Sequence, residues 1–432
     1  MKKTVLNELN DELLNDILPY WIRFAKDSVT SGFFGAIDNM NVPDTNEERS
    51  VVMVSRFLWT YSAAYSMYKK EEYLEMADYA FNYLHNHFFD VVHGGFFWSV
   101  NANGTPKVIR KQIYGNAFAL YALSEYAAAL YKAELDASNA LDEASSSDKS
   151  DGGKSRKSSM NVINIAWKLY QLLQDKAYDS EHKGYYEARN RDWSWTDETK
   201  LSDKDIDCCK SMNTNLHIME AFSALIMALG SIFGKKDFKV IDVQKALSML
   251  ITVHVECILQ KNMHLALYFD RKWNVLEPNE ISYGHDIESS WLLWEAAEAV
   301  GDMCNKKSVR QCVLAIAEVA LNEGFDEKTG GMDNCLHPDG KRDSDRIWWV
   351  QAEAMNGFFN AWQLTQDKKY MNAVEKLWSW ICTFQKDKSH GEWFNCVHKD
   401  GLPDAASVKG GNWKTSYHNG RVCMELLKRC GC

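Results

Sequence analysis

Three consecutive segments decide the fold: RFLWTYSAAYSMYK (56–69), EYLEMADYAFNYLHNHFF (72–89) and GGFFWSV (94–100). The first two place apolar residues at i, i+3, i+4 and i+7, which is the spacing of a buried helix face. The third combines turn-forming glycines with aromatic residues that favour strands. One unit of the chain is therefore predicted to be two helices followed by a short strand.

The glycine-aromatic cluster at 94–100 recurs along the chain, roughly every 60 to 90 residues. The other copies are GFFGAID (32–38), GYYEARN (184–190), HLALYFD (264–270), GGMDNCL (330–336) and GEWFNCV (391–397). Turn sequences such as NANGTP, HPDGKRD and HKDGLPD follow several copies, which predicts a small hairpin in each unit. Helical periodicity fills the intervals, at 116–131, 218–233, 287–300, 350–365 and 373–386.

Six units of this kind predict an all-α (α/α)6 barrel, with an inner ring of helices, an outer ring, and short β-hairpins at the loop end. A tandem helical solenoid is the structural alternative, and six units favour closure. We expect a single domain over residues 1–432, although the length alone predicts about three domains. Residues 136–159 are rich in Ser, Asp, Lys and Gly, and we expect them to form a disordered surface insertion within that domain.

Composition and charge exclude several classes of protein. Lys plus Arg number 49 against 59 Asp plus Glu, and the net charge of -10 argues against a general binder of nucleic acid or anionic membranes. No run of 18 uninterrupted apolar residues occurs, so we expect no membrane span. The start of the chain predicts an amphipathic helix and not a secretion signal. The 11 cysteines include no Cys-x-x-Cys pair, which predicts reduced thiols in a cytoplasmic protein, without disulfides or zinc.

One helix of each unit begins with polar or aromatic residues. These residues are Arg56; Tyr114 and Asn116; Asn213 and His217; His285 and Glu288; Trp349 and Glu353; Trp413 and His418. Six inner helices that present such groups at corresponding places would surround one cavity. This regularity is the strongest functional signal that the residues carry by themselves.

The segment SYGHDIESSWLLWEAAEA is the most informative of these helix starts. His285, Glu288 and Trp291 are spaced i, i+3, i+6, which places them on one helix face. A carboxylate one turn from a histidine can fix its tautomer or raise its pKa, and the tryptophan can stack on a sugar ring. Taken alone, the same pattern also fits a capped core helix. Arg56 enters an otherwise apolar helix, and a buried arginine needs a carboxylate or a ligand as partner.

The candidate catalytic groups are mainly imidazoles, which give and take protons near neutral pH. Two histidines from different units can flank a substrate on opposite faces, which suits epimerisation alpha to a carbonyl through an enediolate. Arg56, Tyr114 and Asn116 are expected to stabilise the developing oxyanion. No nucleotide-binding or lysine motif appears, so no cofactor is implied. His217, Glu220, His285 and Glu288 do not have the spacing of a zinc signature, so we predict no metal.

Four segments are similar to a known family: SRFLWTYSAAY (55–65), SYGHDIESSWL (282–292), RIWWVQAEAMNGF (346–358) and GNWKTSYHNGR (411–421). The chain resembles the N-acylglucosamine 2-epimerase family over nearly its whole length, and within it the cellobiose-acting branch. The resemblance implies an (α/α)6 barrel. It also implies interconversion of glucose and mannose at C2 of the reducing end of β-1,4-linked disaccharides such as cellobiose and lactose.

The resemblance also implies a role for each candidate residue. His285 and His418 match the two acid/base histidines that exchange the C2 proton, and His217 matches a third histidine that assists ring opening or holds the intermediate. Arg56 matches the arginine at the reacting oxygens. Glu288 matches a carboxylate that supports catalysis and is counted among the catalytic residues. The expected substrate-binding residues are Glu353, Trp291, Trp349, Trp413, Tyr114, Asn116 and Asn213. The connection at 136–159 departs from the family, in which it is shorter.

Other functions remain open at this point. The same histidines could serve a monosaccharide 2-epimerase or an aldose-ketose isomerase acting on mannose or N-acylglucosamine. A glycoside hydrolase would need Glu288 and Glu353 as its carboxylate pair. A non-catalytic sugar-binding barrel would bind saccharide without proton exchange. The expected partner is a small disaccharide or oligosaccharide, with no nucleic acid and no membrane, and the expected state is a monomer or weak dimer.

Overall fold

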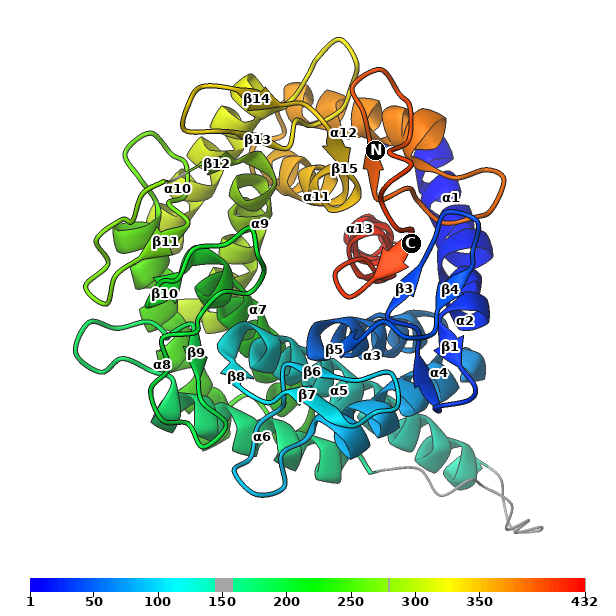
Figure 1. Ribbon diagram of the computed structural model, residues 1–432, viewed down its shortest axis with the longest axis vertical. Coiled ribbons are helices and arrows are strands. Elements are labelled where there is room, and N and C mark those ends of the chain that lie inside the picture. The colour runs from blue at the N-terminus through cyan, green and yellow to red at the C-terminus, as the bar shows by residue number, and fades with distance from the viewer. Residues whose placement is uncertain (144–157, 279, 432) are drawn as a thin grey trace.

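Six helices form a closed inner ring in the computed structural model, which describes residues 1–143, 158–278 and 280–431 (Figure 1). They are α3 (Val51–Tyr68), α5 (Ile113–Glu143), α7 (Met212–Phe233), α9 (Tyr283–Val300), α11 (Trp348–Thr365) and α13 (Tyr417–Arg429). Each helix packs against the next, and α13 packs against α3. The ring is therefore closed, and the solenoid alternative is wrong.

The outer ring places one helical segment beside each inner helix. The first segment is continuous, from α1 (Lys3–Asp11) through a π-helical turn (Glu12–Ile17) to α2 (Leu18–Phe24). The others are α4 (Glu71–Tyr83), α6 (Ser159–Lys176), α8 (Phe238–Val253), α10 (Lys306–Val319) and α12 (Lys368–Trp380). Because α1 packs against α13, the two ends of the chain complete the barrel. The predicted (α/α)6 architecture is confirmed.

Helix positions follow the apolar periodicity, but several helices begin earlier than the pattern indicates. α7 begins at Met212 and α9 at Tyr283, because two-residue strands lead directly into them. Ser50 and Ser211 cap α3 and α7, each accepting a hydrogen bond from a backbone N–H in the first turn. Four outer helices end in π-helical turns, at Leu84–Phe88, His254–Ile258, Ala320–Gly324 and Ile381–Gln385.

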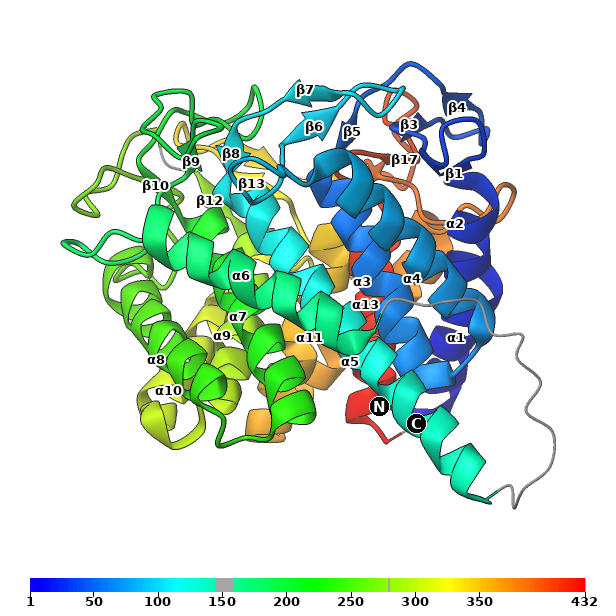
Figure 2. The same ribbon diagram turned by 90° about the horizontal axis from the view of Figure 1, so that it is seen from below.

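Short strands gather at one end of the barrel, and the two termini lie at the opposite end (Figure 2). The strand that enters each inner helix pairs antiparallel with the strand of the next glycine-aromatic cluster. The six pairs are β5 (Arg49–Ser50) with β6 (Ser99–Val100), β8 (Lys111–Gln112) with β9 (Ala188–Arg189), β10 (Lys210–Ser211) with β11 (Tyr268–Phe269), β12 (Ile281–Ser282) with β13 (Cys335–Leu336), β15 (Arg346–Ile347) with β16 (Cys396–Val397), and β17 (Gly410–Gly411) with β3 (Ala36–Ile37).

The predicted hairpin within each unit is only part of this arrangement. Local hairpins join β6 to β7 (Pro106–Val108), β13 to β14 (Arg342–Asp343), and β3 to β4 (Pro43–Asp44). A further pair joins β1 (Lys26–Asp27) to β2 (Gly32–Phe33). The pairing between units was not predicted, because nothing in a single unit specifies its partner strand. This pairing fixes the direction in which every inner helix starts.

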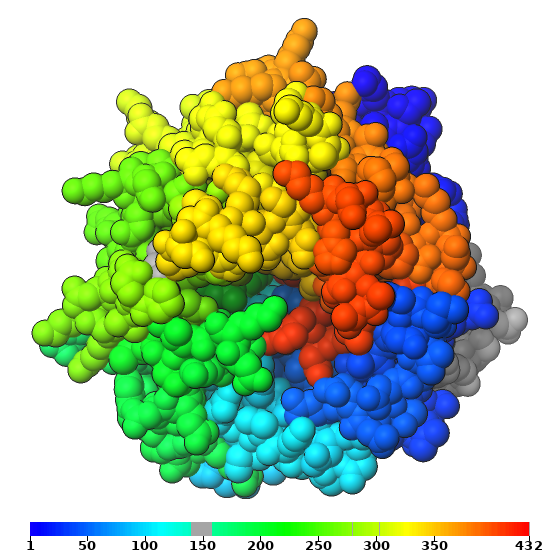
Figure 3. All heavy atoms as spheres, turned by 45° about the horizontal axis from the view of Figure 1, so that its top comes forward, coloured from blue at the N-terminus to red at the C-terminus, as the bar shows by residue number. Residues whose placement is uncertain are grey.

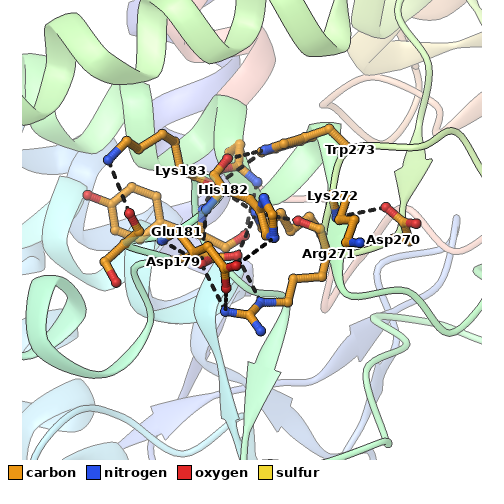
Figure 4. A network of polar contacts seen from close by, with 12 residues as sticks. Asp179, Glu181, His182, Lys183, Asp270, Arg271, Lys272 and Trp273 are labelled. Atoms are coloured by element: carbon orange, nitrogen blue, oxygen red, sulfur yellow. Dashed lines mark hydrogen bonds and ion pairs between the residues drawn. The ribbon is translucent and has the colours of Figure 1, made fainter.

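Buried ion pairs anchor most of these strands. In four units the first residue of the entering strand is a fully buried cation, and in a fifth unit the buried cation, Lys409, directly precedes β17. Each contacts an aspartate of the preceding loop: Arg49–Asp27, Lys111–Asp90, Lys210–Asp179, Arg346–Asp326 and Lys409–Asp387. In the third pair, Arg271 also binds Asp179, and Trp273 donates to the carbonyl of His182 (Figure 4). The fourth unit has Ile281 instead, and there His264 bonds Asp286 at 2.7 Å.

The insertion predicted at 136–159 is partly wrong. α5 continues to Glu143, and Asp136 on it forms an ion pair of 2.6 Å with Lys69. α6 begins at Ser159, so only residues 144–157 of the prediction remain, and these lie outside the described residues. Alanine, leucine and glutamate in this stretch favour the helix despite its Ser, Asn and Asp.

α7 is the one described helix that is long and apolar enough to cross a membrane by length and composition. Its most apolar window is 61% buried within the protein. A helix that is surrounded on most sides by other helices is expected to be apolar nearly all round. The position of α7 in the inner ring therefore accounts for its composition.

Candidate active site

A hollow opens at the strand end of the barrel, between the loops of several units (Figure 3). One pocket of the described residues at this end of the barrel holds ≈ 380 Å³ of empty space, open solvent included. His285 and Asn213 line it, as predicted for both residues, together with Glu187, Thr199, Lys200, Leu201, Asp205, Ile206, Cys208, Ser211, Met212, Leu267 and Tyr268. The walls come from the third and fourth units and from the long loop that precedes β10.

The three predicted histidines occupy the first two turns of three inner helices. His217 lies on α7, His285 on α9 and His418 on α13. Trp349 connects two of them, because its ring lies 4.9 Å from that of His285 and 5.9 Å from that of His418, centroid to centroid. The strand-to-helix junctions thus bring imidazoles from distant parts of the chain together.

His418 is held by a buried carboxylate from the neighbouring helix. Its Nδ1 donates to Glu353 Oε1 at 2.7 Å, while Trp291 Nε1 donates to Glu353 Oε2 at 3.0 Å. Because Nδ1 carries the hydrogen in this arrangement, Nε2 is the nitrogen left to exchange a proton with a substrate. Glu353 is fully buried and supports His418, and its binding of substrate stays a prediction.

His217 has the same kind of partner one turn along its own helix. Its Nδ1 donates to Glu220 Oε2 at 2.8 Å, and the other oxygen of Glu220 accepts from the Tyr417 hydroxyl at 2.7 Å. The ring of Tyr114 meets that of His217 edge-on, with 5.1 Å between centroids. Burial opposes ionisation of Glu220, but Arg421 and His217 lower the pKa of this carboxyl to about 2. His217 therefore faces an anion.

His285 differs from the other two histidines, because a neutral hydroxyl holds its Nδ1. Ser282 Oγ lies 2.8 Å from that nitrogen. Burial lowers the pKa of His285 to about 3 from its ordinary 6.5, and burial likewise lowers the pKa of His418 to about 3 against the opposing effect of Glu353. His285 is therefore kept neutral near pH 7, and His418 has the carboxylate that stabilises an imidazolium.

A single arginine, which sequence reasoning did not assign, connects the carboxylates beneath the histidines. Arg421 donates to Glu288 Oε1 at 2.9 Å and to Glu353 Oε1 at 2.8 Å, and it also contacts Glu220 and Tyr417. All of these side chains are buried. Burial and the charge of Glu353 raise the pKa of Glu288 well above its usual range. The described contacts of Glu288 are therefore those of this supporting network, and its catalytic role stays a prediction.

Arg56 is buried as predicted, and its environment sets it apart from Arg421. It donates to the Trp413 carbonyl and to the Tyr114 hydroxyl, the latter at 3.3 Å, and its guanidinium lies over the rings of Phe118 and Tyr417. Among the described residues Arg56 forms no ion pair with a carboxylate, and its Nε has no hydrogen-bond partner. A preorganised cation without a counter-charge is suited to bind a developing oxyanion.

The predicted sugar-stacking tryptophans divide into two groups. Trp413 is 39% exposed and its ring lies 6.0 Å from that of Trp98, so it remains a candidate platform at the opening. Trp349 is half-buried, and its ring lies near those of His285 and His418. Trp291, however, is only 1% exposed and packs under Arg421, whose guanidinium lies 4.8 Å from its ring. The expected sugar contact of Trp291 is therefore wrong.

Asn116 also has a structural role that the sequence analysis did not assign. Its side chain accepts from the Phe96 N–H at 2.8 Å and donates to the carbonyls of Phe96 and Gln112. Asn215 and Gln351 make the same bonds to Tyr185 and Met332 in their own units. The residue thus ties the glycine-aromatic cluster to the helix, and it does not bind substrate.

We expect Asn116→Ala to lower the free energy of unfolding by about 1–3 kcal/mol, because it leaves buried backbone groups of Phe96 unsatisfied. Denaturant titration of both proteins measures this loss. KM for a sugar substrate is expected to stay within about threefold of the wild-type value. A raised KM without loss of stability would restore Asn116 to the substrate site.

Glu187 is a cavity residue that the sequence analysis missed, although it lies within the quoted cluster GYYEARN. Its carboxyl accepts from Ser211 Oγ at 2.6 Å and from Thr214 Oγ1 at 2.8 Å. Burial raises its pKa to about 7. The signal in the sequence was its position three residues after Gly184. That signal was missed because Ala188 and Arg189, which follow it, are typical of an ordinary strand.

The four residues considered as metal ligands are His217, Glu220, His285 and Glu288, and their side chains already hydrogen-bond to protein groups. Arg421 contacts Glu220 and Glu288 directly, and His217 is bonded to Glu220. His285 hydrogen-bonds Ser282 instead of a carboxylate. The carboxylates are therefore engaged with Arg421, His217 with Glu220, and His285 with a serine hydroxyl.

The lowered histidine pKa values predict acid sensitivity. A histidine that is neutral when folded but titrates near 6.5 when unfolded gives the unfolded state extra protons below that pH, so stability falls as the pH falls. Between pH 7 and pH 5 we expect His285 and His418 each to contribute about 2 kcal/mol of this loss. His285→Gln and His418→Gln should each reduce the loss by that amount in denaturant titrations. An unchanged pH dependence in both variants would contradict the account.

Comparison with known proteins places these features in context. A family model described as N-acylglucosamine 2-epimerase (GlcNAc 2-epimerase) matches residues 32–420. A cellobiose 2-epimerase of Bacteroides fragilis is 35% identical, covering 99% of this chain and 100% of the relative. The solved cellobiose 2-epimerase of Spirochaeta thermophila superposes with a TM-score of 0.85 at 35% identity, covering 99% of this chain and 97% of that one. A D-mannose isomerase of Marinomonas mediterranea is 24% identical over 92% of this chain and 91% of its own length.

Proposed function

The chain belongs to the N-acylglucosamine 2-epimerase family, and on that premise we propose that it is a disaccharide 2-epimerase. It interconverts glucose and mannose at the reducing end of β-1,4-linked disaccharides such as cellobiose and lactose. The observation that carries the proposal is the placement of His285 and His418, on separate helices, close to the same ring of Trp349. The full-length similarity to cellobiose 2-epimerases supports the substrate class.

The proposed reaction is two proton transfers at one carbon. In the ring-opened sugar, one histidine takes the proton from C2, and the C2–H electron pair moves toward the C1 carbonyl to form an enediolate. The other histidine returns a proton to the opposite face of C2, which inverts the configuration. No net oxidation occurs and no cofactor is needed, because only a proton changes place.

His217 is assigned to ring opening or to holding the open form. Its Nδ1 is fixed by Glu220, so its Nε2 is the nitrogen available to exchange a proton with a sugar oxygen. Ring opening must precede C2 deprotonation, since the C2 proton becomes acidic only beside a carbonyl. The third histidine thus prepares the substrate for the other two.

Arg56 is proposed to stabilise the enediolate oxygens. We expect Arg56→Met to lower kcat by about 10²–10³, the usual cost of losing one oxyanion donor. Initial rates of epimerisation on cellobiose, with substrate saturating, measure this effect. Arg56→Lys keeps the charge and should recover part of the rate, so an arginine that served only packing would give equal losses in both variants.

One alternative has an observation in its favour, the similarity to a D-mannose isomerase. An aldose-ketose isomerase forms the same enediolate and returns the proton to C1 instead of C2. The hydrolase alternative fits less well. Glu288 and Glu353 are buried and share the guanidinium of Arg421, so they do not flank an open site as a catalytic carboxylate pair.

The test is product analysis by proton NMR after separate incubations with cellobiose, lactose, mannose and N-acetylglucosamine. Conversion of the disaccharides to mannose-type reducing ends supports the proposal. Conversion of mannose or N-acetylglucosamine alone would assign a monosaccharide-acting enzyme, and a ketose product would assign an isomerase. Free glucose would indicate hydrolysis, and no conversion of any sugar would favour the non-catalytic binding barrel.

We also propose a single-domain enzyme that acts in the cytoplasm as a monomer or weak dimer. The packing of α1 against α13 supports the single domain. Cys208, Cys209, Cys257, Cys304, Cys312, Cys335, Cys382, Cys396 and Cys423 form no disulfide, which suits a reducing compartment. The expected partners exclude nucleic acid and membranes, in keeping with the net charge of -10.

A further inference from the structure

A Cys-x-His sequence occurs twice at the strand end, in NCLHPDG (334–340) and NCVHKDG (395–401). The cysteine begins a two-residue strand and the histidine follows that strand, so the two side chains lie on the same face. The corresponding strand positions in the other four units hold Ala36, Ser99, Ala188 and Tyr268. The barrel therefore does not need a cysteine at this position, and its presence requires another reason.

A carboxylate from the paired strand lies beside each cysteine and histidine, so each cluster has three possible ligands. In the β12–β13 ladder Ile281 faces Leu336 and Ser282 faces Cys335, which places Glu280 opposite His337. In the β15–β16 ladder Arg346 faces Val397 and Ile347 faces Cys396, which places Asp345 opposite His398. The pairing between units therefore builds the same three-residue cluster twice, from residues far apart in the sequence.

The spacing of the donor atoms fits a tetrahedral metal ion. Cys335 Sγ lies 3.8 Å from His337 Nε2 and 3.9 Å from Nδ1, and Glu280 Oε2 lies 3.2 Å from His337 Nδ1. Zn²⁺ with bonds of about 2.0–2.3 Å in tetrahedral geometry separates its ligands by about 3.3–3.8 Å. In the second cluster His398 Nδ1 lies 2.9 Å from Asp345 Oδ1, and the three donors of each cluster lie within 4.8 Å of one another.

The charge environment and exposure also favour a cation. In the described part of the chain, neither Glu280 nor Asp345 has a lysine or arginine within 4.0 Å. The basic group that each carboxylate contacts is a histidine, His337 for Glu280 and His398 for Asp345. The histidines are 41% and 47% exposed, so an ion can enter from solvent. The third carboxylate and histidine group, at Glu353 and His418, differs because Arg421 already neutralises it.

We propose that Glu280, Cys335 and His337 form a binding site for a divalent cation of the Zn²⁺ class, and that Asp345, Cys396 and His398 form a second. Each site offers thiolate, imidazole and carboxylate, the donor types that Zn²⁺ accepts, and water completes the four ligands. The first site adjoins Ser282, whose hydroxyl holds His285. Sequence spacing alone did not reveal either site, because the carboxylate comes from another unit.

Cobalt titration of the full-length, chelator-treated protein tests the proposal, since Co²⁺ bound by a thiolate gives a charge-transfer band and tetrahedral absorption. Two equivalents are expected to bind and to be displaced by Zn²⁺. Cys335→Ser and Cys396→Ser should each leave one equivalent. The double variant should lose the band and bind at least tenfold more weakly. Cys312→Ser, on the outer helix α10 and away from both clusters, should leave the wild-type result unchanged.

The exposed histidines provide a second pair of variants that does not disturb the core. His337→Asn and His398→Asn together should weaken binding at both sites by at least tenfold, with an unchanged circular dichroism spectrum. Binding of two equivalents with the same band by the double cysteine variant would overturn the proposal. Absence of a thiolate band in the wild-type protein would overturn it as well.

Discussion

His418→Ala is expected to lower kcat for cellobiose epimerisation by about 10²–10⁴, because it removes one of the two proton-transfer groups. His285→Ala is expected to cause a loss of the same order. The two losses should not add in the double variant, since neither histidine completes the reaction alone. Initial rates measured by NMR or chromatography give these values directly.

The matched control is His182→Ala, which removes a histidine from a surface loop at the same end of the barrel, outside the cavity lining (Figure 4). This variant should keep the wild-type rate. Circular dichroism and thermal unfolding show whether each active-site variant retains the fold. A folded His418→Ala protein with more than a tenth of the wild-type rate would contradict the assignment of His418.

Arg421→Met is expected to lower the free energy of unfolding by about 3–5 kcal/mol and to abolish activity. The substitution leaves Glu220 and Glu353 buried without their cation, and breaking a buried ion pair from one side costs about this much. The same change frees the carboxylates that orient His217 and His418. Denaturant titration measures the stability loss.

The sign of the pH effect provides a further check on this variant. Without Arg421 the buried carboxyls should titrate at higher pH than in the wild-type protein, so protonation relieves their buried charge as the pH falls. The stability deficit relative to wild type should therefore be smaller at pH 5 than at pH 7. Arg56→Met is the matched control, because Arg56 has no carboxylate partner among the described residues. Its loss should cost only about 1–3 kcal/mol, from the buried hydrogen-bond acceptors left unpaired. Equal losses in the two arginine variants would contradict the network.

The architecture could be predicted from the sequence because it depends on local periodicity. Segments such as 56–69 and 72–89 show a helix face within a few turns, and the recurring glycine-aromatic clusters mark where each unit ends. The histidines could be found for the same reason, since His217, His285 and His418 recur at equivalent helix starts. Repetition along the chain made these features visible.

The supporting network could not be predicted, because it joins residues far apart in the sequence. Arg421 contacts Glu220 across 201 positions and Glu288 across 133. Asn116 and Trp291 were misassigned for a related reason. Their spacing places them near the site, but only the structure shows that Asn116 binds backbone and that Trp291 packs under Arg421. Position on a helix does not determine what a side chain contacts.

The most direct test of the central claim is the epimerisation of cellobiose in D₂O, followed by proton NMR early in the reaction. Two histidines on opposite faces of C2 predict that the mannose-type product carries solvent deuterium at C2, while recovered cellobiose carries almost none. Product that retains its original hydrogen at C2 would contradict the two-histidine mechanism, and deuterium at C1 of a ketose would show that the enzyme is an isomerase.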